Sequence, residues 1–245
     1  MSDRHDLATR PDATDGALEI IALSLDDALA AEEGGATRLE VVRDIHEDGL
    51  TPDVRLVEAL LARVRIPLRV MVRPRNVFEV GDAAHRAEIA RDAALFASLP
   101  VDIVTGYIES GAGGVKGIDE SALALVIERV PSARVTFHRA IEHVAADPVE
   151  IFRRHPAVDR VLSGGGAGPW STRAAALDDL QQRLAPMRVI VGGGVTQEGI
   201  DELVGWPSLR ELHLGRLARR DQSFQSPVDA TIVEAVWARW HDRPT

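Results

Sequence analysis

Residues 188–215 read RVIVGGGVTQEGIDELVGWPSLRELHLG, in which two short apolar runs flank a glycine turn and a longer amphipathic segment. A short apolar run followed by a segment with apolar residues three and four apart is typical of a strand–helix–strand unit with parallel strands. The same alternation recurs along the rest of the chain and gives eight candidate strands. The predicted strands are Leu18–Ala22, Arg38–Val42, Leu68–Val72, Asp102–Gly106, Arg134–His138, Arg160–Ser163, Arg188–Val191 and Glu211–Leu214.

A predicted helix follows each strand. These helices are Leu25–Glu33, Pro52–Val64, Ala83–Leu99, Glu120–Val130, Pro148–His155, Thr172–Leu184, Gln197–Val204 and Val228–Arg239. Thr51-Pro52 and Asp147-Pro148 each read as a capping residue before a proline in the first helical position. Eight units in 245 residues, without a linker or a shift in composition, predict an α/β protein with a single (β/α)8 TIM barrel. An open doubly wound sheet is the alternative fold.

The domain organisation follows from the position of these units. We expect the barrel to occupy residues 17–240, between a polar N-terminal tail over residues 1–16 and a short C-terminal tail over residues 241–245. No apolar run reaches membrane-spanning length, and the first residues lack the apolar stretch of a signal peptide. The sequence therefore predicts a cytoplasmic protein.

The bulk composition excludes several partners and chemistries. The formal net charge is −10, which argues against nucleic acid or an anionic membrane as a partner. The chain contains no cysteine, which excludes disulfides, thiol nucleophiles and thiolate metal sites. A homodimer is common among such barrels, but no segment of the sequence marks an interface. The partner that the composition leaves open is a small molecule.

Several strands carry charged residues on one face, although parallel strands buried on both faces are usually apolar throughout. With a period of two, the apolar faces suit the helix layer and the polar faces point into the barrel. Near the start of the strands, Glu19, Arg38, Arg69 and Glu211 would then form a buried layer. Since buried charges must be paired, we expect an ion-pair network there.

The polar residues near the ends of the strands are the candidate catalytic groups, because barrel enzymes place their chemistry at that mouth. Glu40 and Arg73 are predicted to lie opposite each other, with Arg75 just past the rim. Each arginine either pairs with Glu40 or binds a carboxylate or phosphate. Glu40 is a candidate general base. His138 is a candidate acid or base, a metal ligand or a hydrogen-bonded core residue, and Arg139 beside it is a candidate anion contact.

Glycine-rich loops follow three strands, at Ser110–Gly117, Ser163–Gly168 and Gly192–Gly194. Such loops allow backbone amides to approach a ligand, although they also serve as plain tight turns. In barrels the loops after the seventh and eighth strands often hold phosphate. The predicted ligand-binding residues of these loops are Gly165, Gly193, Gly194, Gly215 and Arg216.

Two further chemistries stay open. Glu40, His138 and His213 come from three strands and could converge on a metal ion, although nothing in their spacing requires it. Schiff-base chemistry would need Lys116, the single lysine, which lies in a glycine loop rather than on a strand.

Five segments together resemble the CutC family of copper homeostasis proteins. They are the glutamate and loop motif at Glu40 and Asp48–Pro52, and the segments Val70–Arg75, Val135–Ala140, Asp159–Gly165 and Val191–Val195. The likeness extends over roughly residues 17–220 and implies a cytoplasmic (β/α)8 barrel with a role in copper tolerance and copper binding. Residues that match characteristic family positions are Glu40, Arg73, Arg75, His138 and Arg139.

The chain departs from this family where copper chemistry is concerned. Family members commonly carry cysteine after the glutamate, where this chain has Val41. Copper is the cofactor that the resemblance implies, but with no thiolate ligand it would need His138, His213 or the loop residues His46 and His143. The second hypothesis is an isomerase, lyase or aldol-type enzyme. It would hold a small phosphorylated or carboxylated metabolite at the arginines and use Glu40 and His138 for proton transfer.

Overall fold

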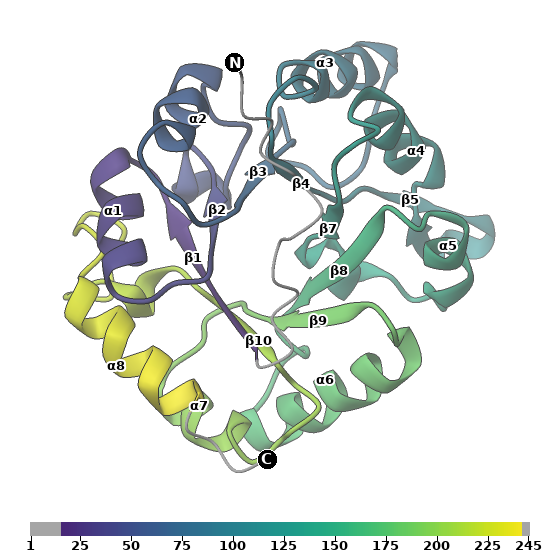
Figure 1. Cartoon of the computed structure of the whole chain (residues 1–245). Helices are drawn as coiled ribbons and strands as arrows, with labels where there is room; N and C mark the ends of the chain where they lie inside the picture. Colours follow the sequence, from purple (N-terminus) through teal and green to yellow (C-terminus); the bar gives the residue numbers. More distant parts are fainter. Residues whose placement is uncertain (1–15, 242–245) are drawn as a thin grey trace.

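A computed structural model describes residues 16–241, which fold into a closed barrel of parallel strands (Figure 1). The strands of the barrel are β1 (Ala17–Ala22), β2 (Arg38–Val41), β3 (Leu68–Met71), β4 (Asp102–Thr105), β7 (Val135–Phe137), β8 (Val158–Ser163), β9 (Arg188–Val191) and β10 (Glu211–Leu214). They pair in chain order, and β1 pairs with β10 to close the barrel. The predicted TIM barrel is confirmed, and the open sheet is wrong.

Helices form the outer layer around the barrel (Figure 1). They are α1 (Leu25–Glu33), α2 (Val54–Leu61), α3 (Ala83–Ala94), α4 (Glu120–Arg129), α5 (Val149–Arg154), α6 (Trp170–Leu184), α7 (Gln197–Leu203) and α8 (Ala230–His241). Short 3-10 turns lie at Ile45–Glu47 (η2), Ala112–Gly114 (η3), Arg139–His143 (η4) and Arg216–Ala218 (η5). Polar N-cap residues fix the start of several helices. Thr196, for example, precedes α7, and its hydroxyl accepts a hydrogen bond from the backbone N–H of Gly199 in the first turn.

The two predicted proline starts are wrong by one or two residues. Asp53 caps α2, which begins at Val54, because the Thr51 hydroxyl instead accepts the backbone N–H of Arg73 at 2.9 Å. Pro148 precedes α5 as its N-cap residue rather than opening it.

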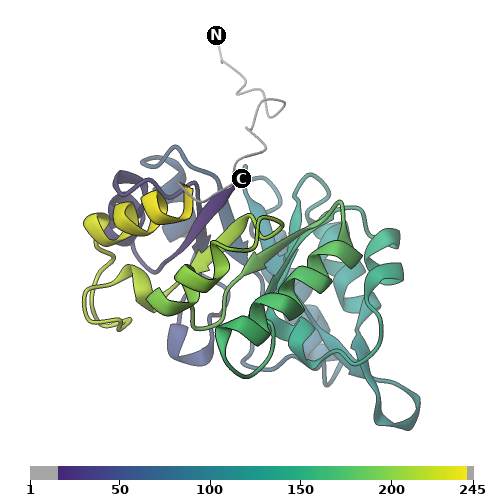
Figure 2. The same cartoon turned by 90° about the horizontal axis from the view of Figure 1, so that it is seen from below.

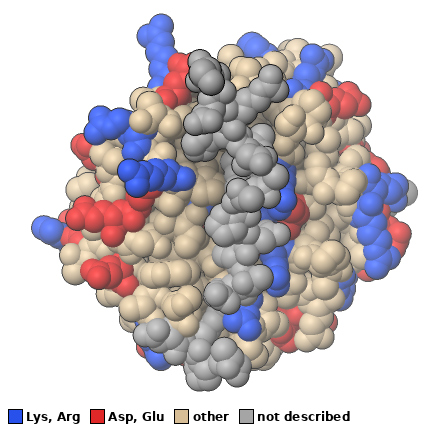
Figure 3. Space-filling model, viewed as in Figure 1, with Lys and Arg blue, Asp and Glu red and all other residues tan. Residues whose placement is uncertain are grey.

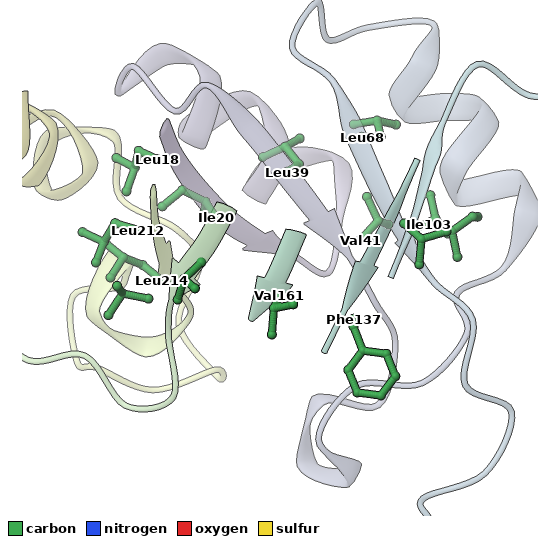
Figure 4. Close-up of a cluster of buried hydrophobic side chains, with 14 of the residues drawn as sticks. Leu18, Ile20, Leu39, Val41, Leu68, Ile103, Phe137, Val161, Leu212 and Leu214 are labelled. Atoms are coloured by element: carbon green, nitrogen blue, oxygen red, sulfur yellow. The ribbon is translucent and has the colours of Figure 1, made fainter. Parts of the chain in front are cut away.

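The hydrophobic core lies between the barrel and the helices. Leu18, Ile20, Leu39 and Leu212 are among its members, and each is fully buried. Figure 4 shows these side chains leaving the strands with the alternation that the sequence predicts. Burial of each such side chain contributes roughly 1.5–3 kcal/mol, so this layer holds the strands in place and leaves the barrel interior free to carry polar groups.

The predicted ion-pair network fills the lower barrel interior. Arg38 bridges Glu19 and Glu211, the second at 2.8 Å, and Arg160 also reaches Glu211 at 2.8 Å. Arg69 donates to Asp159 at 2.9 Å. The network is therefore confirmed, and it is completed by Asp159 and Arg160, since β8 begins two residues earlier than predicted.

The glycine-rich segment Ser110–Gly117 is more regular than the sequence suggested. It joins β5 (Ile108–Ser110) to β6 (Lys116–Ile118) in an antiparallel hairpin. The hairpin projects from the body of the barrel at the lower right of Figure 2. Lys116 pairs with Glu79 at 2.9 Å and lies 44% exposed, so the structure gives no support to a Schiff-base role.

The predicted tails fall mostly outside the described residues. Of residues 1–16 and 241–245, only Gly16 and His241 are described, and His241 is the last residue of α8. None of the helices within residues 16–241 is long and apolar enough to cross a membrane. On the visible part of the face in Figure 3, acidic and basic side chains are interspersed, so no continuous field of one sign covers it.

Candidate functional site

A pocket of about 510 Å³ opens at the ends of the strands, within the usual size range of small-molecule sites. It is lined by segments that follow most of the barrel strands, as expected for the mouth of a TIM barrel. The predicted site residues that it brings together are Glu40, Arg73, His138, Arg139, Gly193, Gly194, His213, Gly215 and Arg216.

Arg75 and Gly165 do not line this pocket. The Arg75 guanidinium binds the Glu88 carboxylate of α3 with two hydrogen bonds of 2.6 and 2.9 Å. Gly165 has a φ of +75°, and a Cβ there would lie 2.5 Å from the Arg173 carbonyl oxygen. The first residue is therefore tied to a helix, and the second is a glycine because the chain turns tightly against α6.

Arg73 is a buried cation that is held by neutral acceptors. Its Nη1 donates to the carbonyl oxygens of Glu47 and Gly49 at 2.9 and 3.0 Å, and its Nη2 donates to Asn76 Oδ1. Its guanidinium lies 4.9 Å from the centre of the Phe78 ring. Burial lowers the pKa of Arg73, because a charge away from water is costly. An anion in the pocket would offset that cost.

The predicted pairing of Arg73 with Glu40 is wrong. Glu40 lies in register with Arg69, and Arg73 comes four residues later in the chain. Within residues 16–241, no carboxylate oxygen lies within 4 Å of the Arg73 guanidinium nitrogens, and Glu47 and Asp48 act on it only at longer range. Its charge therefore lacks a direct counter-charge.

His138 presents a hydrogen-bond donor rather than an acid or base. Its Nδ1 accepts the Ala140 amide at 3.1 Å, so a neutral ring carries its proton on Nε2. That Nε2 is buried and has no hydrogen-bond partner among the described residues. Burial lowers the pKa of His138 to about 3, and the charges of Arg73 and Arg139 act in the same direction. At neutral pH the ring is uncharged, and its Nε2–H is a donor without an acceptor among the described residues.

Gly106 makes room for this histidine. A Cβ at residue 106 would lie 2.8 Å from Nδ1 of His138. The sequence showed Gly106 only as the end of a strand, and its role is visible only when the strands β4 and β7 are paired. The ring also packs against Phe78, with centroids 5.3 Å apart.

Glu40 and His213 form a second polar unit in the pocket, with Glu19 below them. Glu19 Oε1 lies 2.8 Å from His213 Nδ1, and His213 Nε2 lies 3.8 Å from Glu40 Oε2. Burial raises the pKa of Glu40 to about 7. Burial lowers the pKa of His213, but Glu40 and Glu19 outweigh that effect and raise it. The second oxygen of Glu40, Oε1, is buried and has no hydrogen-bond partner among the described residues.

The donor set does not fit a resident copper ion. Within residues 16–241, the ligand atoms of Glu19, Glu40 and His213 lie within 4.8 Å of one another, and His138, predicted as a ligand, is not part of this group. Both oxygens of Glu19 are engaged, one with His213 and the other with Arg38. Two protein ligands then remain, fewer than the three or four of typical metal sites, and copper(I) prefers sulfur.

Two side chains that the sequence did not indicate hold the glycine loops: Glu142 binds the loop after β8, and Arg173 joins that loop to the one after β9. The Gly164 amide donates to Glu142 Oε1 at 2.5 Å, and Arg139 pairs with the same carboxylate at 3.1 Å. Arg173 donates to the carbonyl oxygens of Gly164 and Gly193 at 2.6 and 2.9 Å. The Glu142 carboxylate therefore takes one amide of the loop Ser163–Gly168, which was predicted to approach a ligand.

The fold and the pocket define a (β/α)8-barrel protein with a small-molecule site at the ends of its strands. Residues 17–218 match the model of the CutC family, and the chain belongs to that family. The CutC protein of Xanthomonas campestris pv. campestris (strain B100) is 34% identical over 206 residues, which cover 80% of this chain and 81% of that protein. The CutC protein of Mesorhizobium japonicum is 31% identical and covers 82% and 77% of the two chains.

Solved structures show the same fold. The CutC protein of Streptococcus agalactiae, which is named for copper homeostasis, superposes with a TM-score of 0.71 at 21% identity and covers 82% of this chain and 98% of that one. Phosphoribosyl anthranilate isomerase from Thermococcus kodakaraensis gives 0.58 at 16% identity, covering 93% and 99%. At these identities the likeness concerns the barrel and not its chemistry.

Proposed function

We propose that this CutC-family protein binds a small anionic molecule in the pocket at the barrel mouth, with Arg73 as the principal contact. One observation carries the proposal: Arg73 is a buried cation without a direct carboxylate partner, and it lines the same pocket as the free Nε2–H of His138. Nearby charges that lack counter-charges attract an anion strongly away from bulk water. Arg216, which also lines the pocket, adds to this field, whereas the charge of Arg139 is offset by Glu142.

A second candidate function, an enzyme of the isomerase, lyase or aldol type, is favoured by Glu40. Its pKa of about 7 makes it able both to give and to take a proton near neutral pH. Its unpartnered Oε1 and its position on the pocket wall support a role in proton exchange with a bound carboxylated or phosphorylated molecule. The proton-transfer role predicted for His138 does not enter this proposal, because its low pKa keeps the ring neutral.

Anion binding is tested by thermal shift with inorganic phosphate and with citrate, since a ligand of the native state raises the melting temperature by mass action. At about 100 times the dissociation constant the gain is ~2.7 kcal/mol, or roughly 5–10 °C for a chain of this length. Arg73→Gln should remove most of this shift. Arg75→Gln is the matched control, because Arg75 lies two residues away and binds Glu88 outside the pocket.

Copper(II) is the contrasting probe in the same assay. We expect no copper-dependent shift that His213→Ala removes, because only two protein ligands remain at that site. Equal anion shifts in the parent, Arg73→Gln and Arg75→Gln would overturn the proposed anion site. A copper shift that His213→Ala abolishes would show that the donor set has been misjudged.

A further inference from the structure

The pocket is lined by two chemically different groups of residues. Arg73, His138 and Arg139, which follow β3 and β7, form a cationic group. Ile21, Ile45, Met71 and Phe224 form an apolar group. These apolar residues belong to a cluster separate from the main core, which also includes Val42 and Val104.

The apolar group lies inside the barrel mouth, where most other inward residues are polar. Ile21 stands in register with Glu40, and Met71 with Val104. Ile21 and Met71 are 7% and 4% exposed, and what remains of their surface borders the pocket. A polar or fully hydrated ligand would gain nothing from this wall, whereas an apolar group that displaces water from it would be stabilised.

Phe224 is held in place as the outer part of this wall. A Cβ at Gly215 would lie 2.6 Å from Phe224 Cζ and 3.0 Å from Ile21 Cδ1, so the glycine lets the ring approach β1. Arg219 is 2% exposed, pairs with Asp27 at 2.8 Å and donates to the Ser226 carbonyl oxygen at 2.6 Å. The loop that carries Phe224 is therefore fixed to α1 at Asp27 and to β1 at the Ile21 carbonyl oxygen, and the apolar wall is already formed before a ligand binds.

We infer that the ligand is an amphipathic oxyanion, with a carboxylate or phosphate head at Arg73 and His138 and an apolar carbon body against Met71, Ile21 and Phe224. The inference rests on the proposed anion site and adds the class of molecule that fills the rest of the pocket. The observation behind it is that one cavity of about 510 Å³ is lined both by a cationic group and by a cluster of apolar residues. A bare inorganic anion would leave the apolar residues unused.

The test is a homologous series of probes, straight-chain carboxylates from acetate to hexanoate, titrated into the full-length protein by NMR. Each added methylene should tighten binding by about fourfold while it is buried against the wall. Phe224→Ala should reduce this gain per methylene, so that hexanoate loses more affinity than acetate, whereas Phe224→Leu should keep most of the gain. Arg73→Gln should weaken every member by a similar factor and leave the gain per methylene unchanged.

The outcomes separate the two proposals. Affinity that depends on Arg73 but is flat along the series would overturn the amphipathic ligand and keep the anion site. A gain along the series with no effect of Arg73→Gln would overturn the anion site itself. A parallel series of alkyl phosphates identifies the head group, because the preferred series binds more tightly at equal chain length. Phe224 lies in a surface loop, and an unchanged circular dichroism spectrum confirms that its variants are folded.

Discussion

Two regions of the barrel mouth carry the sequence signals of an anion site, and the structure treats them differently. In the glycine loops after β8 and β9, the Glu142 carboxylate accepts the Gly164 amide and pairs with Arg139. Near the ends of β3 and β7, Arg73 has only neutral acceptors and His138 Nε2 has none among the described residues. The difference teaches that an anion site is identified by donors that lack an internal acceptor, and not by the number of donors.

The largest expected effect comes from removing the Glu142 carboxylate from the glycine loop after β8. Glu142→Ala removes the acceptor of the Gly164 amide and the partner of Arg139, and should lower the free energy of unfolding by about 1–3 kcal/mol. Phosphate should restore part of this loss in the variant, because an added anion can take the vacated position. Urea unfolding with and without phosphate measures both effects.

A suitable control for this experiment is Glu150→Ala. Glu150 is 72% exposed and pairs only with the exposed Arg153, so its loss should change stability by less than about 0.5 kcal/mol. If phosphate stabilises Glu142→Ala no more than it stabilises the parent, the loop after β8 is not a latent anion site, and Glu142 serves only to hold Gly164 next to Arg139.

An intermediate effect should follow the ionisation of Glu40. Its pKa is raised to about 7 by burial, with Glu19 acting in the same direction and His213 and Arg38 against it. As pH rises through about 7, Glu40 becomes negative, and binding of an anion at Arg73 should weaken severalfold. Sulfate is the probe, because its own charge is constant between pH 5.5 and 8.5. Glu40→Gln should reduce this pH dependence, and the part that remains belongs to His213, whose pKa is also raised.

The same group has a defined effect on stability. The folded state binds the Glu40 proton more tightly than the unfolded state, whose pKa is near 4.5. Its contribution to stability is therefore complete below pH 4.5 and is lost as pH rises through about 7. The raised pKa of His213 acts with the same sign. A parent protein whose stability relative to Glu40→Gln does not fall over this interval would contradict the assigned pKa.

The sequence predicts the scaffold well because periodicity records it. The eight strands, their apolar outer faces and the buried network of Arg38 with Glu19 and Glu211 all follow from a period of two. The relative height of strands is not recorded in this way. Glu40 was expected opposite Arg73 but lies in register with Arg69, because strands in a barrel are tilted and staggered against one another. Four residues correspond to roughly 13 Å along a strand, enough to separate the two groups.

The loop residues of the site could not be predicted for a different reason. Glu142 and Phe224 lie outside the strands and helices α1–α8, and Arg173 lies in α6, so the period-two pattern of the strands does not mark any of them. The useful signals were glycines. Gly106 and Gly215 are small because His138 and Phe224 occupy the space beside them, and a glycine at the end of a barrel strand therefore indicates a neighbouring side chain as much as a ligand.

The smallest expected effect concerns His138. It is also the sharpest test of the region around Arg73 and His138. Because burial and the two arginines lower its pKa to about 3, its ring should not titrate between pH 5 and 9, and anion binding above pH 5 should not follow it. The NMR shifts of its ring protons, assigned by comparison with His138→Gln, measure this directly. If the His138 ring gains a proton near pH 6, the protein itself must supply a counter-charge, because a cationic His138 beside Arg73 requires an internal acceptor for both. The contrast between the Arg73–His138 region and the glycine loop held by Glu142 would then fail.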